Sequence, residues 1–318
     1  MNRAAISRAG MKRQRGLTVT ELLVAVAIGT MVTLLAVTLL VSANASYVAH
    51  TEQANLDDAG RFAMSTLERA ARQTGFADWE RNGAAGANVD GPSPIHGLDA
   101  ASLSSDKVGT TDPHPPVVNG SDVLALRFAG SGSAKGDGSS TTCAGFAVGA
   151  GQEGWSIFYV GASAKGEPEL RCKYRGANGW SADAVVAGVD SFQVLYGIDT
   201  DAIADGQANR FATASEINTL DAGLALDGDT ELARARDQMR KTHWKRVASL
   251  KVALVLHGSR RSKSIGAESV MHLFGVAYSN AAPGDKGARV DQALMKPALR
   301  ERERRTFSST IMLRNQLR

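Results

Sequence analysis

The fold of this chain is decided by the stretch Arg13-Gln14-Arg15-Gly16-Leu17-Thr18-Val19-Thr20-Glu21-Leu22-Leu23, where a basic segment gives way to an apolar run. Residues 22–41 are twenty consecutive residues without a charge. At about 1.5 Å per residue, a helix of this length spans roughly 30 Å, the thickness of a bilayer's hydrocarbon core. Glu21 lies at the edge of the run, and because a carboxylate in lipid costs about 2.5–3.5 kcal/mol, it is a candidate functional residue. We therefore expect one membrane-spanning helix over 22–41.

The same residues resemble the cleavage and methylation signal of type IV prepilins, in which a glycine precedes a hydrophobic residue and glutamate occupies the fifth mature position. Here these residues are Gly16, Leu17 and Glu21. The resemblance implies that a prepilin peptidase cuts after Gly16 and methylates the new amino terminus, Leu17. It also implies that Glu21 meets the amino terminus of a neighbouring subunit, where the two opposite charges offset each other's desolvation. The chain departs from the commonest signal at Leu17, where phenylalanine is frequent, and at Val19-Thr20, where leucine and isoleucine are usual.

Two other interpretations of the start of the chain stay open. A secretory signal is one of them, since Ala43-Asn44-Ala45 provides an A-x-A cleavage site. Its apolar region is usually about 7–15 residues long, shorter than the run seen here, and it has no use for Glu21. A plain single-span anchor is the other, and it leaves Gly16 and Glu21 unexplained.

The distribution of charge predicts the orientation and argues against nucleic-acid binding. The formal net charge is +4, from 36 basic and 32 acidic residues. Residues 1–16 contain five basic residues and no acid, so removing them leaves 31 basic and 32 acidic groups, a net charge of −1. Positive charge keeps this end in the cytoplasm, and the remainder is therefore expected in the periplasm of a Gram-negative cell. No direct nucleic-acid partner is expected.

The chain has two cysteines, Cys143 and Cys172. In an oxidising compartment we expect them to form a disulfide, which would stabilise the fold by roughly 3–4 kcal/mol in the chain-entropy model. Two separate buried thiols are the alternative. The sequence has no C-x-x-C motif, which argues against a redox-active pair.

The apolar run continues as an amphipathic helix. Leu56, Ala59, Ala63, Leu67 and Ala70 recur at three- and four-residue spacing, and no proline occurs before residue 92. A leader over 1–16 and one long helix over 17–75 are therefore expected, with Gly75 as the stop signal. The first half should span the membrane, and the second should lay one face on a globular domain.

The rest of the chain predicts a connecting loop region over 76–121 and a β-rich periplasmic domain over 122–318. Glycine, proline and small polar residues dominate the connecting region. Alternating and β-branched residues predict the following strands: Asp122–Ala129, Gly145–Val148, Trp155–Val160, Glu169–Tyr174, Val185–Ile198, Val247–Leu256, His272–Tyr278 and 304–313. Helical patterning occurs at Ser215–Leu220 and Thr230–Met239. The expected fold class is α+β, with a long N-terminal helix packed on an antiparallel sheet domain, as in pilins.

Three later segments resemble the PilW family of minor pilins: a strand ending in Tyr-Gly-hydrophobic-Asp (Asp190–Asp199), the segment Trp244–Val247 before the next strand, and the C-terminal Arg305–Thr310 with Arg314-Asn315. The resemblance implies a structural subunit that starts in the inner membrane with a single span and then enters the pilus. Expected partners are other minor pilins, the major pilin, a tip adhesin, the prepilin peptidase and the inner-membrane assembly machinery.

No motif predicts an enzyme, a cofactor or a bound metal. The six histidines have no metal-binding spacing, and no nucleophile elbow occurs. Gly149–Gly154 matches G-x-G-x-x-G, but a strand is expected after it where a nucleotide site needs a helix, so we interpret it as a hairpin turn. Asp199, Asp201 and Asp205 could approach calcium, yet the glycine and glutamate of an EF-hand loop are missing, which favours a solvated turn.

The sequence thus predicts a minor pilin that helps to initiate a type IV pilus at its tip. A minor pseudopilin of a type II secretion system and a membrane-anchored periplasmic binding module remain the alternatives. The pilus function itself, whether adhesion, twitching motility or DNA uptake, is left open by the sequence.

Overall fold

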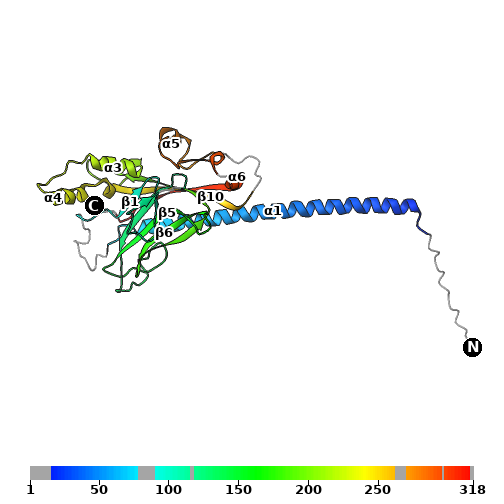
Figure 1. Ribbon diagram of the computed structural model, residues 1–318, viewed down its shortest axis with the longest axis horizontal. Helices are drawn as coiled ribbons and strands as arrows, with labels where there is room; N and C mark the ends of the chain where they lie inside the picture. Colours follow the sequence, from blue (N-terminus) through cyan, green and yellow to red (C-terminus); the bar gives the residue numbers. More distant parts are fainter. Residues whose placement is uncertain (1–15, 78–89, 115–117, 262–269, 296, 316–318) are drawn as a thin grey trace, which may run out of the picture. The chain divides into compact units, whose positions relative to one another are not determined.

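The computed structural model describes residues 16–77, 90–114, 118–261, 270–295 and 297–315 of the chain (Figure 1). The predicted leader, 1–16, lies outside these residues except for Gly16. The chain forms two compact units, Met1–Thr51 and Glu52–Arg318. The helix α1, Val19–Gln73, contributes to both.

In the first unit, every side chain from Gly16 to Tyr47 is exposed. Within the described residues, α1 is the one helix long and apolar enough to cross a membrane, with a mean hydropathy of 2.5 in its most apolar window and none of that window buried. Because the run is rich in leucine and alanine and lacks proline, nothing interrupts the helical hydrogen bonds.

In the second unit, α1 buries one narrow face, made of the following residues: Leu56, Gly60, Ala63, Thr66, Leu67, Ala70 and Ala71. This is the three- and four-residue spacing expected from the sequence. At Gly60 the backbone lies so close to the ring of Phe307 that a Cβ atom would overlap it. The helix ends at Gln73, and Gly75 follows with a φ of +73°, which confirms the predicted stop signal.

The strands of the second unit form two large antiparallel sheets, which confirms the expected α+β fold with an antiparallel β domain. The division of the strands between two sheets was not predicted. The five-stranded sheet has the order β1-β4-β5-β6-β7, with β1 (Ile95–Leu98), β4 (Val123–Ala129), β5 (Glu153–Ala162), β6 (Pro168–Gly176) and β7 (Gly179–Ala187). The four-stranded sheet has the order β13-β10-β8-β9, with β8 (Val189–Ile198), β9 (Arg210–Ala212), β10 (Val247–Arg261) and β13 (Arg302–Met312).

The smaller elements lie between or after these strands. They are β2 (Ser102–Leu103), β3 (Pro113–His114), α3 (Ala214–Ala222), α4 (Glu231–Lys241), η2 (His243–Arg246), β11 (Val270–His272), α5 (Val276–Ala281), β12 (Arg289–Asp291), η3 (Gln292–Leu294) and α6 (Pro297–Arg300). α3 and α4 follow one another at one end of the unit (Figure 1). Both occur where the sequence showed helical patterning.

One core joins both sheets and α1. Leu124 and Leu126 of the first sheet and Val252 and Leu254 of the second all belong to it, together with Leu67 of α1. The residues that alternate with them point the other way, as the two-residue period of a strand requires. They enter two smaller clusters, one on the far face of each sheet.

The predicted strand Val185–Ile198 is in fact two strands that belong to different sheets. Gly188 separates β7 from β8 and has a φ of +77°, with its would-be Cβ against the backbone of His257. A left-handed glycine allows the abrupt change of direction that carries the chain from one sheet to the other. The apolar alternation of Phe192, Val194 and Tyr196 was predicted correctly, and these side chains all enter the main core.

Two other predicted strands are wrong, and one region is more ordered than expected. His272–Tyr278 contains the end of β11 and the start of α5, because Gly275, with a φ of +94°, breaks the extended backbone. Residues 145–148 follow a turn and form no regular strand; Ala147 makes one isolated bridge, with Thr141. The connecting region 76–121 contains β1, β2 and β3, and β1 is an edge strand of the larger sheet.

Candidate assembly site

The start of α1 carries the residues that the sequence singled out. Gly16 and Leu17 are exposed and precede the helix, which begins at Val19. Thr18 N and Thr18 Oγ1 each donate a hydrogen bond to Glu21 Oε2, both at 2.9 Å, and Glu21 N donates to Thr18 Oγ1 at 3.3 Å. This reciprocal pattern is a capping box, which satisfies backbone donors that the first turn leaves free.

The capping box was not predicted, although the sequence contains its signal. Thr18 and Glu21 stand in the T-x-x-E spacing, directly before an apolar run, that marks a helix start. Glu21 thus has a local role in the uncut chain besides any role between subunits. Within the described part of the chain, its second oxygen, Oε1, makes no hydrogen bond.

The cysteines form the predicted disulfide. Cys143 lies in the loop between β4 and β5, and Cys172 lies on β6, with a Cα–Cα distance of 5.9 Å. Cys143 N donates to Ser156 Oγ at 2.9 Å, which ties the same point to β5. The rings of Phe146 and Tyr174 lie 5.0 Å apart beside the bridge. The disulfide therefore anchors a long loop to the middle of the first sheet.

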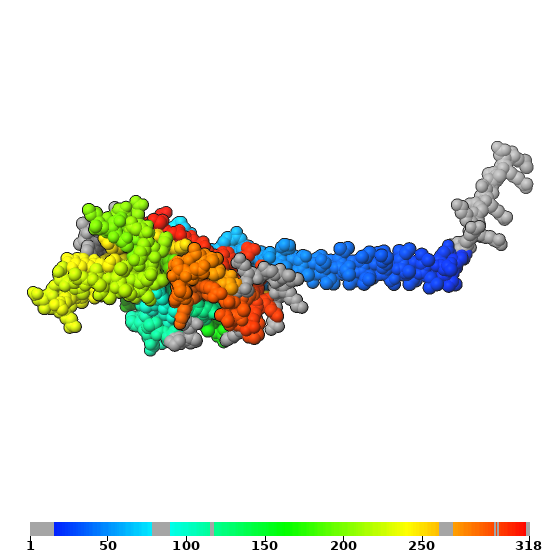
Figure 2. All heavy atoms as spheres, turned by 90° about the horizontal axis from the view of Figure 1, so that it is seen from above, coloured from blue at the N-terminus to red at the C-terminus, as the bar shows by residue number. Residues whose placement is uncertain are grey.

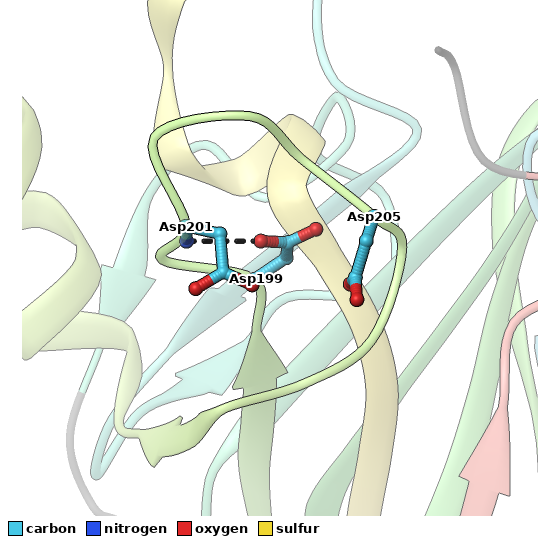
Figure 3. A group of neighbouring side chains, drawn as sticks. All are labelled: Asp199, Asp201 and Asp205. Atoms are coloured by element: carbon cyan, nitrogen blue, oxygen red, sulfur yellow. Dashed lines mark hydrogen bonds between the residues drawn. The ribbon is translucent and has the colours of Figure 1, made fainter.

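The three aspartates considered for calcium lie together in the loop between β8 and β9 (Figure 3). Asp199 is buried and accepts hydrogen bonds from Gly206 N (2.7 Å) and Asp201 N (3.0 Å). The Gly206 amide is the main cause that lowers the pKa of Asp199 below its usual value. Asp201 and Asp205 are exposed, and each holds a local hydrogen bond, with Asn209 Nδ2 and Gln207 N. Because these bonds close the loop by themselves, the arrangement does not require an ion.

A polar cluster around the buried side chains of His257 and Asp190, at one end of the second sheet, was not predicted. His257 lies between two acids, with Nδ1 2.9 Å from Asp190 Oδ1 and Nε2 3.4 Å from Glu167 Oε2. Arg304 Nε donates to Asp190 Oδ2 at 2.7 Å, and Arg302 donates to both oxygens of Glu167 at 3.0 and 3.2 Å. Glu167 belongs to the turn between β5 and β6, so the cluster joins the two sheets. The sequence held no local signal for it, since its members come from four separate segments.

Gly149–Gly154 forms a turn that leads into β5, as expected. Gln152 N donates to Gly149 O at 3.0 Å, and β5 begins at Glu153. No helix follows the glycines, so this segment lacks the helix N-terminus that binds phosphate in nucleotide sites.

Comparison with known families agrees with this structure. Residues 157–315 match the family model described as "Type IV Pilus-assembly protein W", and residues 11–37 match the prokaryotic N-terminal methylation motif. No curated protein and no solved structure matches the chain.

An exposed apolar helix with a methylation motif at its start, followed by an antiparallel β domain, defines a pilin-like protein. The chain belongs to the type IV pilus-assembly protein W (PilW) family, whose model covers half of its length. This is a family of structural pilin subunits, which implies interaction with other pilins and with the assembly machinery.

Proposed function

We propose that this chain is a minor pilin that helps to initiate a type IV pilus within a complex of minor pilins at the tip. It would begin as a single-span protein of the inner membrane with a periplasmic domain over 122–318 and then enter the pilus. Its partners would be other minor pilins, the major pilin and, at the tip, an adhesin. The observation that carries the proposal is the capped helix start at Thr18 and Glu21, at the head of an apolar helix that no described residue covers.

Processing would occur at the exposed residues that precede the helix. A prepilin peptidase would cut between Gly16 and Leu17 and methylate Leu17, removing the leader 1–16. The exposed, non-helical backbone at these residues supports access for a peptidase. The new amino terminus would lie four residues before Glu21.

Glu21 would then act between subunits. A methylated amine carries a positive charge into an apolar helix bundle, where an unpaired charge is costly. The carboxylate of a neighbouring Glu21 neutralises it, so pairing sets the depth at which one subunit stands beside the next. The free Oε1 of Glu21 supports this role, because the capping box engages only Oε2.

The mature amino terminus tests the first half of the proposal. Mass spectrometry of the protein from its native membrane should find an N-methylated Leu17. A start at Ser46 would indicate a secretory signal and contradict the proposal, and an intact chain in cells with active prepilin peptidase would indicate a plain anchor. Loss of secretion instead of pili on deletion of the gene would indicate a type II secretion pseudopilin.

Two matched variants separate the two roles of Glu21. Glu21→Gln keeps an acceptor for the capping box and removes the charge, whereas Thr18→Ala removes the cap and keeps the charge. We expect Glu21→Gln to abolish incorporation of the subunit into pili, with Thr18→Ala close to wild type. Equal incorporation of both variants would mean that the charge has no role in assembly.

A further inference from the structure

The outer edge of β13 is the longest unpaired strand edge of the two large sheets. β13 has eleven residues and pairs only with β10 among the described strands. The other edge strands are β1 with four residues, β9 with three and β7 with nine. A long edge presents a row of free backbone donors and acceptors to any strand that lies beside it.

The register shows which amides of β13 point outward. Leu313 N donates to Ala248 O at 3.0 Å, and Met312 stands opposite Ser249 in an unbroken antiparallel ladder. In such a ladder the residues alternate between pointing their backbone groups toward the partner strand and away from it. Ser309 therefore bonds to β10, whereas Ser308 and Thr310, like Thr306 and Met312, direct N–H and C=O away from it. None of these outward amides has a partner within the described residues.

The sequence of this edge lacks the features that usually prevent strand addition. Thr306–Met312 is Thr-Phe-Ser-Ser-Thr-Ile-Met, with neither a charge nor a proline. The charged residues of β13 are Arg302, Glu303, Arg304 and Arg305, and all of them precede this segment. The three arginines have acidic partners: Arg302 pairs with Glu167, Arg304 with Asp190 and Arg305 with Asp57. Thr306, Ser308, Ser309, Thr310 and Met312 are exposed, and red atoms of this C-terminal segment reach the surface in Figure 2.

A second copy of the chain does not suit this edge. Antiparallel pairing of two β13 strands relates the copies by a two-fold axis, which reverses the direction of every element beside the strand. α1 runs along β13 in the same direction, since Asp57 pairs with Arg305 and Asn315 Nδ2 donates to Arg72 O. The α1 helices of the two copies would then approach the joint sheet from opposite ends. Chains that are anchored in one membrane instead have their α1 helices at the same end.

We propose that the Thr306–Met312 edge accepts an extended strand from a different subunit of the same pilus complex, which extends the four-stranded sheet to five. The donated segment is uncharged and carries hydroxyl or β-branched residues that face Ser308 and Thr310, as in other strand-addition interfaces. The inference rests on the proposed role in pilus assembly.

Hydrogen exchange of the full chain tests this pairing. The outward amides of Ser308 and Thr310 should exchange at least about a hundredfold more slowly in sheared pili than in the purified chain in detergent. The amide of Ser309, which is bonded to β10 in both states, is the internal control. Outward amides that stay fast in pili overturn the strand pairing and leave the proposed function intact. Absence of the chain from sheared pili, with Leu17 uncut, overturns both.

Substitutions on the edge give a second test. Thr310→Pro removes an outward N–H without breaking the ladder to β10, whereas Ser309→Pro breaks that ladder. We expect the Thr310→Pro chain to keep its disulfide and its melting temperature within a few degrees. Its content in pili should fall about tenfold or more, where each tenfold corresponds to ~1.4 kcal/mol of binding free energy. Thr310→Lys, which keeps the N–H and adds an edge charge, should do the same, while Ser181→Lys on the edge strand β7 should not.

A folded Thr310→Pro or Thr310→Lys chain with unchanged content in pili would overturn the inference. A second copy as the occupant is detected separately with Ser309→Cys, because antiparallel pairing centred on Ser309 brings the two introduced thiols together across the strands. A disulfide-linked dimer of this variant in native membranes would contradict the choice of a different subunit.

Discussion

The two halves of α1 use apolar residues in opposite ways. Between Leu22 and Val41 the helix is apolar on all sides, and no side chain is buried. Between Leu56 and Ala71 it has one narrow buried face of small residues and leucine, and the remainder is mixed, with five charged residues and the exposed Phe62. The first half suits an apolar solvent or contact with other helices on all sides, while the second half suits contact with one protein surface. Hydrophobicity alone therefore does not predict whether a helix is buried within its own chain; the width of its apolar face predicts it.

The largest expected contrast comes from truncating one leucine in each half. Leu67 is fully buried, so Leu67→Ala should lower the free energy of unfolding of the second unit by about 3–5 kcal/mol. Leu35 is 54% exposed, and Leu35→Ala should leave that free energy unchanged. Denaturant titration of the full chain in detergent, followed by tryptophan fluorescence, measures both. Equal effects of the two variants would remove the distinction.

Loss of the disulfide should act on the second unit alone. Replacing both Cys143 and Cys172 by serine opens a long loop, which should cost about 3–4 kcal/mol of stability in the chain-entropy model. Helicity from residues 19–51 should be unaffected. In a thermal melt followed by circular dichroism at 222 nm, the second unit should unfold at a lower temperature than in the wild type. The helical signal that remains after this transition should be unchanged. A drop in that remaining signal would show that the first half depends on the second unit.

α4 is a third kind of helix, exposed like the first half of α1 but held by charges. Asp237 is its one buried residue, and the Lys241 ammonium, followed by the Asp227 amide, lowers the pKa of Asp237 to about 2. A lowered carboxyl pKa adds stability above the unfolded value of 3.8, and this stability is lost as the pH falls toward 2. The protection factors of the α4 amides, taken relative to the intrinsic exchange rate at each pH, should therefore fall between pH 4 and about 2, and Asp237→Asn should abolish that fall. A loss of protection that persists in Asp237→Asn would point to another group.

The smallest effect concerns two neighbouring acids on the second half of α1. Asp57 pairs with Arg305 of β13, whereas Asp58 pairs, among the residues that the structure describes, only with Arg61 on the exposed side of the same helix. Asp57→Asn should cost up to about 1 kcal/mol, and Asp58→Asn close to zero. A double-mutant cycle with Arg305→Gln isolates the pair energy. A coupling of zero would mean that Phe307 and Gly60, and not charge, hold the helix on β13.

The features that could be predicted from the sequence have local or periodic signals. The apolar run, the spacing of Leu56, Ala63 and Leu67, and the strand alternation from Phe192 to Tyr196 each repeat with the period of their element. The disulfide followed from the compartment and the count of cysteines. The chemistry at Gly16, Leu17 and Glu21 came from a motif, and its role stays a prediction.

The features that could not be predicted depend on contacts between distant segments. The division into two sheets depends on the backbone conformation of Gly188. In the sequence, this glycine looks like one more residue within an apolar strand. The cluster of His257, Asp190 and Glu167 forms only when both sheets are in place. The open edge of β13 follows from strand order, which no single segment specifies.

The first and last segments of the second unit lie against each other along their lengths, and this arrangement governs how the unit bears mechanical tension. A pull transmitted through α1 loads the Asp57–Arg305 pair, the Gly60–Phe307 contact and the Asn315–Arg72 hydrogen bond together, in shear. Contacts in shear share the force, whereas contacts that are peeled break one at a time. Since forced unfolding is governed by the unfolding rate, a subunit built in this way yields slowly when it is dragged by its helix.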